Sequence, residues 1–529
     1  MPPVIAAVAS VAAAVGAAAT AVVGALGLTG LVSALGMSAL GFIATTVSIG
    51  ATLLAGRPKM PQNSPENVNR LRATIDPRTP RKTVVGNTAM ATDIRDEEFT
   101  DNQTYFHRFI VCASHPCESI DEIWFDDKLA WTLALGVINE FVGYLTVQPV
   151  PLGNTAYNIS ARMGDTRKFT GLANVHLRYK LTGNTKKTDS PFAQSIPSRI
   201  TIKGKAARLY DPRMDSTVPG GSGLQRADDQ TTWVWDDNAC RNPALALLFY
   251  LLGWRNNGLL AVGKGIPANR IDLESFIVAA NICDEVVSKG GVTTEPRYRC
   301  DGVWSEADSP TVVMDALKAC MNADLDDVDG KLRITIFQDD TAVSDADFTA
   351  DDVLGEFEWT PASALEDTFN IIRGIYTDPS AASLYQQIDY PQVEVPSPDG
   401  IDRIETLNLP MVESDTQAQR LASLRLERQN FSGIFKAEFQ ATAWRVQKNS
   451  IVRLTFPPLG FVDKVFRVAE MDLRADGIVP LVLREESTSI YVAPAFKPPL
   501  VPIDGTSHDP SLDPIIDAIG DRQIGRAHV

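Results

Sequence analysis

One stretch, from Thr231 to Gly302, constrains the fold of this chain most, because its pattern predicts two helices in fixed places. Asn242 is a good helix cap, and Pro243 after it suits the first helical position. The apolar residues that follow at helical spacing would share one face: Leu245, Leu248, Phe249 and Leu252. The sequence therefore predicts an amphipathic helix that begins at about residue 243.

The second helix of this stretch is predicted after Asp272, which can cap it. Phe276, Ile277 and Ala280 would lie on its apolar face. Three glycines break the chain between the two helices: Gly258, Gly263 and Gly265. Because no catalytic signature falls here, we interpret the stretch as a packing module whose two helices cover another part of the protein.

Most of the remaining pattern is typical of antiparallel β structure. Alternating residues predict strands at 105–111, 120–131, 175–181, within 197–213, and at 331–337, 370–376, 434–445, 451–456, 464–471 and 478–486. Pro480 suggests that the last strand lies at a sheet edge. Two further helices are expected, one after Ser309 and one at 415–429 with Asp415 as its cap. The predicted fold class is α+β and β-rich, with barrel-like antiparallel domains and covering helices.

Composition limits the function classes. The chain has 529 residues, enough for several domains, and its hydrophobic fraction of 44% fits globular protein. The net charge of −16 argues against tight binding to a nucleic-acid backbone, which needs clusters of Lys and Arg. The charge is compatible with a channel that DNA passes without adhering.

The N-terminal stretch, residues 2–56, contains no charged side chain. A break at residues 24–30 leaves two apolar arms of roughly 22 and 26 residues, each long enough to cross a bilayer as a helix. A secretory signal would need a basic start, which Met1-Pro2-Pro3-Val4 lacks. A membrane hairpin stays open as an interpretation. We favour an apolar helical element that packs inside an assembly and later meets a membrane.

Several groups of residues have side chains that could form a chemical site. Cys112, His115 and Cys117 resemble metal ligands, but their spacing is not that of a zinc finger. The run Asp324, Asp326, Asp327 and Asp329 does not follow the calcium-loop order, and Asp329-Gly330 instead predicts a hairpin turn. His107 and the carboxylates Asp121, Glu122, Asp126 and Asp127 are interpreted as strand and turn residues. The cluster Gly220, Gly221 and Gly223 lacks the Lys-Ser/Thr of a phosphate loop and is expected to be a mobile loop. We predict no catalytic, cofactor-binding or metal site.

A resemblance to a known family covers about residues 80–491. The carrying motifs are N-P-A-L-A-L-L at 242–248, G-I-P-A-N at 265–269, Y-R-C-D-G-V at 298–303, Y-D-P-R at 210–213 and N-I-I-R-G-I-Y at 370–376. In this order they resemble the hub part of lambda-type tail-tip attachment proteins, the central fibre proteins of long, non-contractile phage tails. Residues 47–61 resemble the hydrophobic end of the small tail-assembly protein of such phages.

The resemblance implies a trimeric, β-rich hub that closes the distal end of the tail tube and opens for DNA ejection. The tape-measure protein and neighbouring tail-tip or distal tail proteins are its implied partners, and the virion tail tip its location after synthesis in the host cytoplasm. Host-envelope contact through residues 2–56 is a hypothesis. No sequence-specific nucleic-acid binding is expected, although DNA would pass through the lumen.

These interpretations divide the chain into six parts: an apolar segment at 1–56, a linker at 57–74, a β-rich domain at 75–215 with an insertion at about 133–170, a helix-containing domain at 216–345, a barrel-like domain at 346–491 and a Pro-rich linker at 492–529. The last six residues resemble a translated sequencing adapter, so we expect the natural chain to continue beyond about Gln523. Two alternatives stay open, a membrane-anchored cellular binding protein and a tip-borne cell-wall hydrolase.

Overall fold

The structure is a computed structural model. It describes residues 74–75, 79–156, 166–181, 189–193, 195–291, 293–362, 368–397, 399–474 and 476–498. The chain divides into two units, residues 1–62 and 63–529, and every described residue belongs to the second. The helical hairpin predicted for residues 2–56 lies outside the described residues. Among the helices described, none is both long and apolar enough to span a bilayer.

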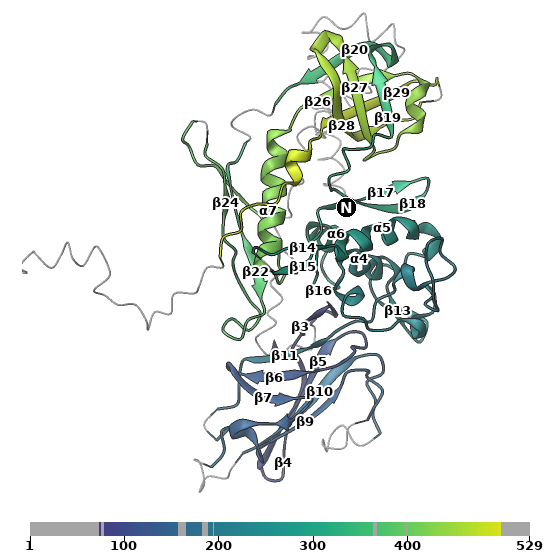
Figure 1. The fold of residues 1–529 in the computed structure, drawn as a ribbon. Coiled ribbons are helices and arrows are strands. Elements are labelled where there is room, and N and C mark those ends of the chain that lie inside the picture. The colour runs from purple at the N-terminus through teal and green to yellow at the C-terminus, as the bar shows by residue number, and fades with distance from the viewer. Residues whose placement is uncertain are drawn as a thin grey trace, which may run out of the picture. The chain divides into compact units, whose positions relative to one another are not determined.

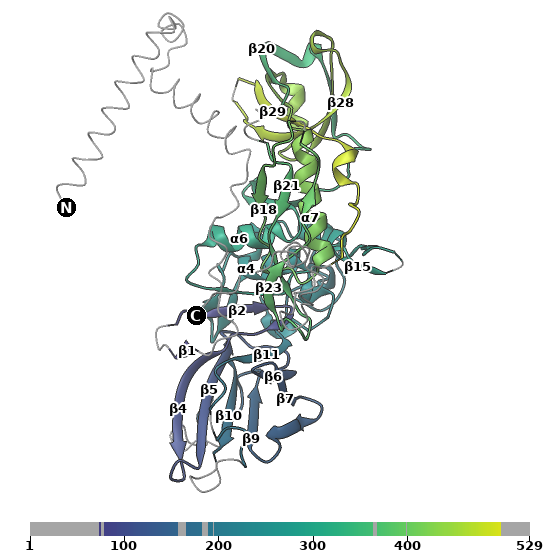
Figure 2. The ribbon, with the colours of Figure 1, turned by 90° about the vertical axis from the view of Figure 1, so that its left-hand side faces the viewer.

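The first part of the described chain forms two facing β-sheets (Figure 1, Figure 2). One has the strand order β1-β4-β5-β10-β9 and the other β3-β11-β6-β7-β8. The strands are β1 (Thr74–Ile75), β3 (Asn87–Ala89), β4 (Asp93–Thr100), β5 (Tyr105–Ala113), β6 (Glu122–Phe125), β7 (Lys128–Thr132), β8 (Gly136–Val137), β9 (Leu145–Val150), β10 (Ala173–Lys180) and β11 (Ile200–Lys205). Side chains of both sheets, including Ile110, Phe125 and Leu177, share one apolar core.

The predicted strand alternation is confirmed in β5. Phe106 and Ile110 point into the core between the sheets, whereas Phe109 and Val111 pack with Val150 on the opposite face. The turn predicted at Asp126 and Asp127 joins β6 to β7, with φ of 45° and 73° at the two residues. Within the range expected to be an insertion, β9 pairs along β10 and forms the edge of its sheet.

The helices α4 (Pro243–Leu252), α5 (Leu273–Asp284) and α6 (Pro310–Ala319) follow. The caps predicted at Asn242 and Asp272 are confirmed, and Ser309 caps the third helix; each side chain accepts a hydrogen bond from a backbone N–H of the first turn. Short two-stranded sheets surround the helices: β12 (Trp254–Asn256) with β13 (Leu259–Val262), β14 (Val286–Ser288) with β15 (Thr294–Pro296), β16 (Gly302–Ser305) with β2 (Lys82–Val85), and β17 (Ala323–Val328) with β18 (Lys331–Ile336).

A long helix, α7 (Asp415–Asn430), lies beside two small sheets. These contain β21 (Ile371–Arg373), β24 (Val393–Glu394) and β25 (Ile404–Thr406), and β22 (Ile375–Asp378) with β23 (Gln386–Asp389). The prediction of a single strand at 370–376 is wrong, because the strand is interrupted at Gly374, between β21 and β22. At that break, Gly374 lies so close to the carbonyl of Leu407 that a side chain would collide with it.

The last part is a six-stranded sheet that curls as a half-barrel, with the order β19-β27-β28-β29-β26-β20 (Figure 1). The strands are β19 (Ala346–Thr349), β20 (Val353–Thr360), β26 (Ile434–Phe439), β27 (Ile451–Phe456), β28 (Phe461–Met471) and β29 (Val479–Glu485). Its core is rich in phenylalanine: Phe348, Phe435, Phe439, Phe456, Phe461 and Phe466. The predicted fold class, α+β with barrel-like antiparallel domains, is confirmed for the described residues.

Three sequence predictions in this region are wrong. The strand predicted at 434–445 ends at Phe439, because residues Ala441–Arg445 form a 3-10 turn. Pro480 does not mark an edge, because β29 pairs with both β26 and β28. Proline is tolerated there because it is the second residue of the strand, where the ladder has only begun, and its carbonyl still accepts from Asp472. The cap of α7 is Ser414 rather than Asp415, since the Ser414 hydroxyl accepts from the backbone of Gln417 at 3.3 Å.

Candidate functional site

The candidate site is the joint around α4, where the motifs singled out in the sequence meet. All ten residues of α4 are buried, so the prediction of an amphipathic helix is wrong for this element. Its sequence P-A-L-A-L-L-F-Y-L-L contains no charged residue, and such a helix is stable only when protein surrounds it. The second helix follows the prediction better: Phe276 and Ala280 are buried, while Ile277 is only half-buried. Val278, on the opposite side, is exposed.

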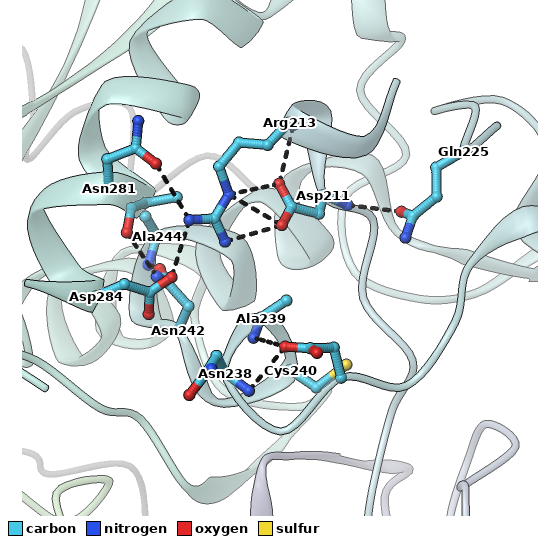
Figure 3. Close-up of polar contacts among 12 residues, drawn as sticks. Asp211, Arg213, Gln225, Asn238, Ala239, Cys240, Asn242, Ala244, Asn281 and Asp284 are labelled. Atoms are coloured by element: carbon cyan, nitrogen blue, oxygen red, sulfur yellow. Dashed lines mark hydrogen bonds and ion pairs between the residues drawn. The ribbon is translucent and has the colours of Figure 1, made fainter. Parts of the chain in front are cut away.

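Asn242 ties the two helices together (Figure 3). Its side-chain oxygen accepts from the backbone N–H of Ala244 at 3.1 Å, and its amide nitrogen donates to the carbonyl of Ala280 in α5 at 3.0 Å. The residue is fully buried. One side chain therefore caps α4 and fixes its start against α5.

Arg213, from the Y-D-P-R motif, binds the same C-terminal part of α5 (Figure 3). Its guanidinium donates to Asp211 at 2.8 Å and to Asp284 at 2.8 Å, and it reaches Asn281 at 3.2 Å. Burial alone would lower the pKa of Arg213, but hydrogen bonds and charge from Asp211 and Asp284 outweigh burial and raise it. The arginine is thus a permanently charged clamp between the loop 211–226 and the helix.

Asp301, from the Y-R-C-D-G motif, joins three segments that are distant in sequence. It accepts two hydrogen bonds of 2.8 Å from Arg241 and one of 2.8 Å from the backbone N–H of Asn87. Its own N–H donates to the carbonyl of Met411 at 2.9 Å. Gly86 lies directly against the carboxylate, and a side chain there would collide with it. The motif therefore connects the first β-rich part to the helices.

Polar side chains of α7 complete the joint. Gln417 accepts from the N–H of Arg299 at 2.9 Å and donates to the carbonyls of Arg299 and Cys320 at 2.9 and 3.0 Å. Arg420 donates to Glu295 at 2.7 Å and to the carbonyl of Arg297 at 2.8 Å. These groups are buried and consumed by internal contacts, so the arrangement suits mechanical coupling of segments rather than bond-making chemistry.

The Cys112–Cys117 group is a packed strand end. The His115 ring nitrogens are used by the N–H of Val84 at 3.0 Å and the carbonyl of Pro116 at 2.9 Å. Burial lowers the pKa of His115 to about 4 despite these backbone contacts. All six cysteines are buried free thiols, and burial raises the pKa of Cys112 and Cys117. Within the described ranges, no three His, Cys, Asp or Glu side chains gather as metal ligands would.

His107 packs beside a second histidine that the sequence reading did not single out. Its ring lies 5.3 Å from that of His176 on the next strand, and both residues are buried. Burial, followed by the charge of His107, lowers the pKa of His176 to about 4. The Nε2 of His107 contacts the Thr100 hydroxyl at 2.9 Å. The alternation of β5 and β10 brings the rings together, but only strand pairing reveals it.

The predicted acidic candidates are separated. Glu122 accepts from Trp124 and pairs with Lys203, while Asp127 pairs with Arg199 at 2.9 Å. The hairpin predicted at Asp329-Gly330 is confirmed, with β17 and β18 on either side. Two of its carboxylates, Asp324 and Asp326, bind Lys448, which comes from the loop before β27.

The glycine cluster is closely packed. Gly221 lies against the carbonyls of Pro212 and Asp215, where a side chain would not fit. Gly223 has a φ of 135°, which L-residues rarely adopt. Asp215 also accepts from Arg226 at 3.0 Å, which closes the loop on itself.

Comparison with known proteins places this fold among solved structures. No family model matches the chain, and no curated protein matches it. The fold is similar to a chain in the virion of a native gene transfer agent particle, with 15% identity, coverage of 85% of this chain and 97% of that chain, and a TM-score of 0.55. This likeness establishes a shared fold.

Two further structures were matched with lower scores. One is the 43 kDa tail protein of prophage MuSo2 from Shewanella oneidensis, with 11% identity, 78% and 96% coverage of the two chains and a TM-score of 0.27. The other is the prophage tail protein gp18 from Listeria monocytogenes EGD-e, with 11% identity, 75% and 89% coverage and a TM-score of 0.21.

Proposed function

We propose that this protein is a virion structural protein and forms the distal hub of a long, non-contractile phage tail. The observation that carries the proposal is the extent of the shared fold: nearly the whole of a virion chain, 97%, matches 85% of this one. The order of the sequence motifs, which resembles that of lambda-type tip proteins, agrees with it. The mechanism is mechanical and non-enzymatic.

In this proposal the protein acts as a trimer at the tail tip. The trimer closes the tube, contacts the tape-measure protein and neighbouring tip proteins, and opens when the tip meets the host. Residues 2–56 would shelter in the lumen and contact the envelope during DNA entry. The joint around Asn242, Arg213 and Asp301 supports this role, because it would transmit force between the β-rich parts. The division at about residues 215, 345 and 491 belongs to the same proposal.

The test is the solution mass of a fragment spanning Arg57 to Pro499, measured by light scattering after size exclusion. The expected result is three times the mass of the monomer. If the fragment is a monomer, addition of the tail-tube end should convert it to a trimer. A monomer that stays a monomer in both conditions would contradict the hub. Activity on peptidoglycan in a gel overlay would favour the hydrolase alternative instead.

A further inference from the structure

A hollow beside α4 is not used by the joint described above. Its volume is about 320 Å³, at the lower end of the ~300–1,000 Å³ typical of small-molecule sites. The wall is formed by the segments after β5, β9 and β11, a short 3-10 turn at Gln230–Thr232, α4 and the start of β12. A hollow of this size suits a ligand of one or two sugar-sized rings.

Aromatic rings line one side of the hollow. Trp233, Phe249 and Trp254 all contribute to the wall. Trp233 is held in place, because its indole N–H donates to the carbonyl of Arg226 at 2.8 Å and its ring meets Phe249 edge-on at 6.1 Å. Trp233 and Phe249 are buried and form the back of the wall, whereas Trp254 is half-buried and can meet a ligand. An aromatic ring placed in this way binds the apolar face of a ring-shaped ligand.

Two arginines supply positive charge to the same hollow. Arg208 pairs through Nε with Glu118 at 2.6 Å, which leaves its two terminal nitrogens without a partner among the described residues. The Arg255 guanidinium makes no hydrogen bond or ion pair with any residue that the structure describes, and the residue is exposed. No acidic residue lines the hollow. Because Glu118 balances the charge of Arg208, Arg255 supplies the one unpaired positive charge among the residues that line the hollow.

The side chains of Gln230 and Thr231 are held in place by hydrogen bonds but can each form further ones. Gln230 donates to the carbonyl of Gly253 at 3.3 Å and accepts from the N–H of Arg255 at 3.2 Å. An amide side chain can make up to four hydrogen bonds, so it retains capacity for a ligand hydroxyl. The Thr231 hydroxyl donates to Asp229 at 2.6 Å and can still accept.

We propose that this hollow binds one ring of an acidic sugar, a pyranose that carries a carboxylate. The sugar's C–H face packs on Trp254, its carboxylate pairs with Arg255, and its hydroxyls meet Gln230 and Thr231. A planar guanidinium can bind a carboxylate through two parallel hydrogen bonds. Because the Arg255 guanidinium has no ion pair with a described residue, it need not break one to bind the sugar carboxylate. This inference does not rest on the hub proposal, since any surface polysaccharide or free uronate offers the same ring.

The test uses the full-length chain in a detergent without sugar head groups. Binding of glucuronate and galacturonate is followed by saturation-transfer NMR and compared with that of neutral methyl glucoside. We expect uronate binding to be saturable and about tenfold or more tighter than binding of the neutral sugar. The neutral sugar has no carboxylate and so lacks the charged hydrogen bond to Arg255. Arg255→Gln should bring uronate down to the neutral sugar, and Trp254→Ala should weaken both.

Matched controls are an exposed arginine and an exposed tryptophan elsewhere, Arg270→Gln and Trp444→Ala, which should bind like the unchanged protein. Thermal melts of each variant show whether it folds. The proposal is overturned if uronate shows no saturation up to about 10 mM, or if Arg255→Gln binds it as well as the unchanged chain. Competition by acetate as effective as that by uronate would equally overturn it, as would stronger binding of a peptide's terminal carboxylate.

Discussion

Arg467 offers a sharp test of what holds the half-barrel to its surroundings. The residue is 1% exposed, and its Nε donates to Glu486 at 2.8 Å. It also donates to the carbonyl of Asn449 at 2.9 Å and pairs with Asp340. Arg467→Met removes the charge but keeps an unbranched side chain. The carboxylate of Glu486, whose side chain is fully buried, then keeps only Arg428 and the Tyr491 hydroxyl, each at 3.1 Å.

The expected cost follows from the loss of one partner of a buried ion pair, about 3–5 kcal/mol. Because Arg428 still compensates part of the charge, we expect the lower end, about 3 kcal/mol, or about a hundredfold in the local opening equilibrium. Amide hydrogen exchange of peptides from β28 and β29 reads this equilibrium directly. The expected result is protection about a hundredfold lower in both strands.

The matched control is Arg474→Met. Arg474 pairs with Glu438 at 2.7 Å, but the two side chains are 41% and 44% exposed. A solvent-exposed pair contributes about 0–1 kcal/mol, so protection should fall by less than about fivefold. If both variants lose protection equally, the buried pair does not hold these strands, and the reasoning is wrong.

Three further predictions concern the joint and its neighbours. Asn242→Ala should cost about 1–3 kcal/mol, seen as a lower melting temperature, because two buried hydrogen bonds are lost; an unchanged melt would contradict the coupling of α4 to α5. Gly86→Ala should fail to give folded protein, since the new methyl group collides with Asp301, whereas Gly291→Ala, also at positive φ but in open space, should cost only about 1 kcal/mol; equal circular-dichroism melts would refute this. His115 has a pKa of about 4 in the folded protein against 6.5 when unfolded, so unfolding takes up a proton between these values. The unfolding free energy should therefore fall on acidification through this window, and this one histidine should account for about 1.4 kcal/mol of the fall per pH unit. Unfolding free energies measured by denaturant titration at several pH values should depend less on pH in His115→Gln; the same pH dependence in both proteins would count against this reasoning.

Local chemistry in the sequence predicted local structure well. The predicted caps at Asn242 and Asp272 are correct because a cap depends on a side chain and a backbone N–H two or three positions away. The position of Pro480 was misread because its setting depends on two strands that join it from elsewhere.

The sequence indicates which motifs belong to the joint but not which of their side chains contact one another. The partner of Asp301, for example, is Arg241, which lies 60 positions away. The contact of Arg467 with Asp340 spans 127 positions, and no local pattern reports such a distance. One local pattern could have indicated a buried ion pair: a charged residue next to a glycine among apolar residues, as in C-D-G at 300–302.

The order of strands in the half-barrel has a consequence for how the chain is made. β20 and β26 are neighbours in the sheet, but residues 361–433 are synthesised between them. β20 must therefore wait until β26 is complete at Phe439, and β19 until β27 is complete at Phe456; Phe348, which is buried in the folded sheet, stays uncovered in that interval. The sheet itself is complete only when β29 ends at Glu485. Strand pairings between such distant segments form slowly, and the incompletely paired intermediate is prone to aggregate in the meantime. The half-barrel closes only late in synthesis, and a chaperone that shields its first two strands would raise the yield of folded protein.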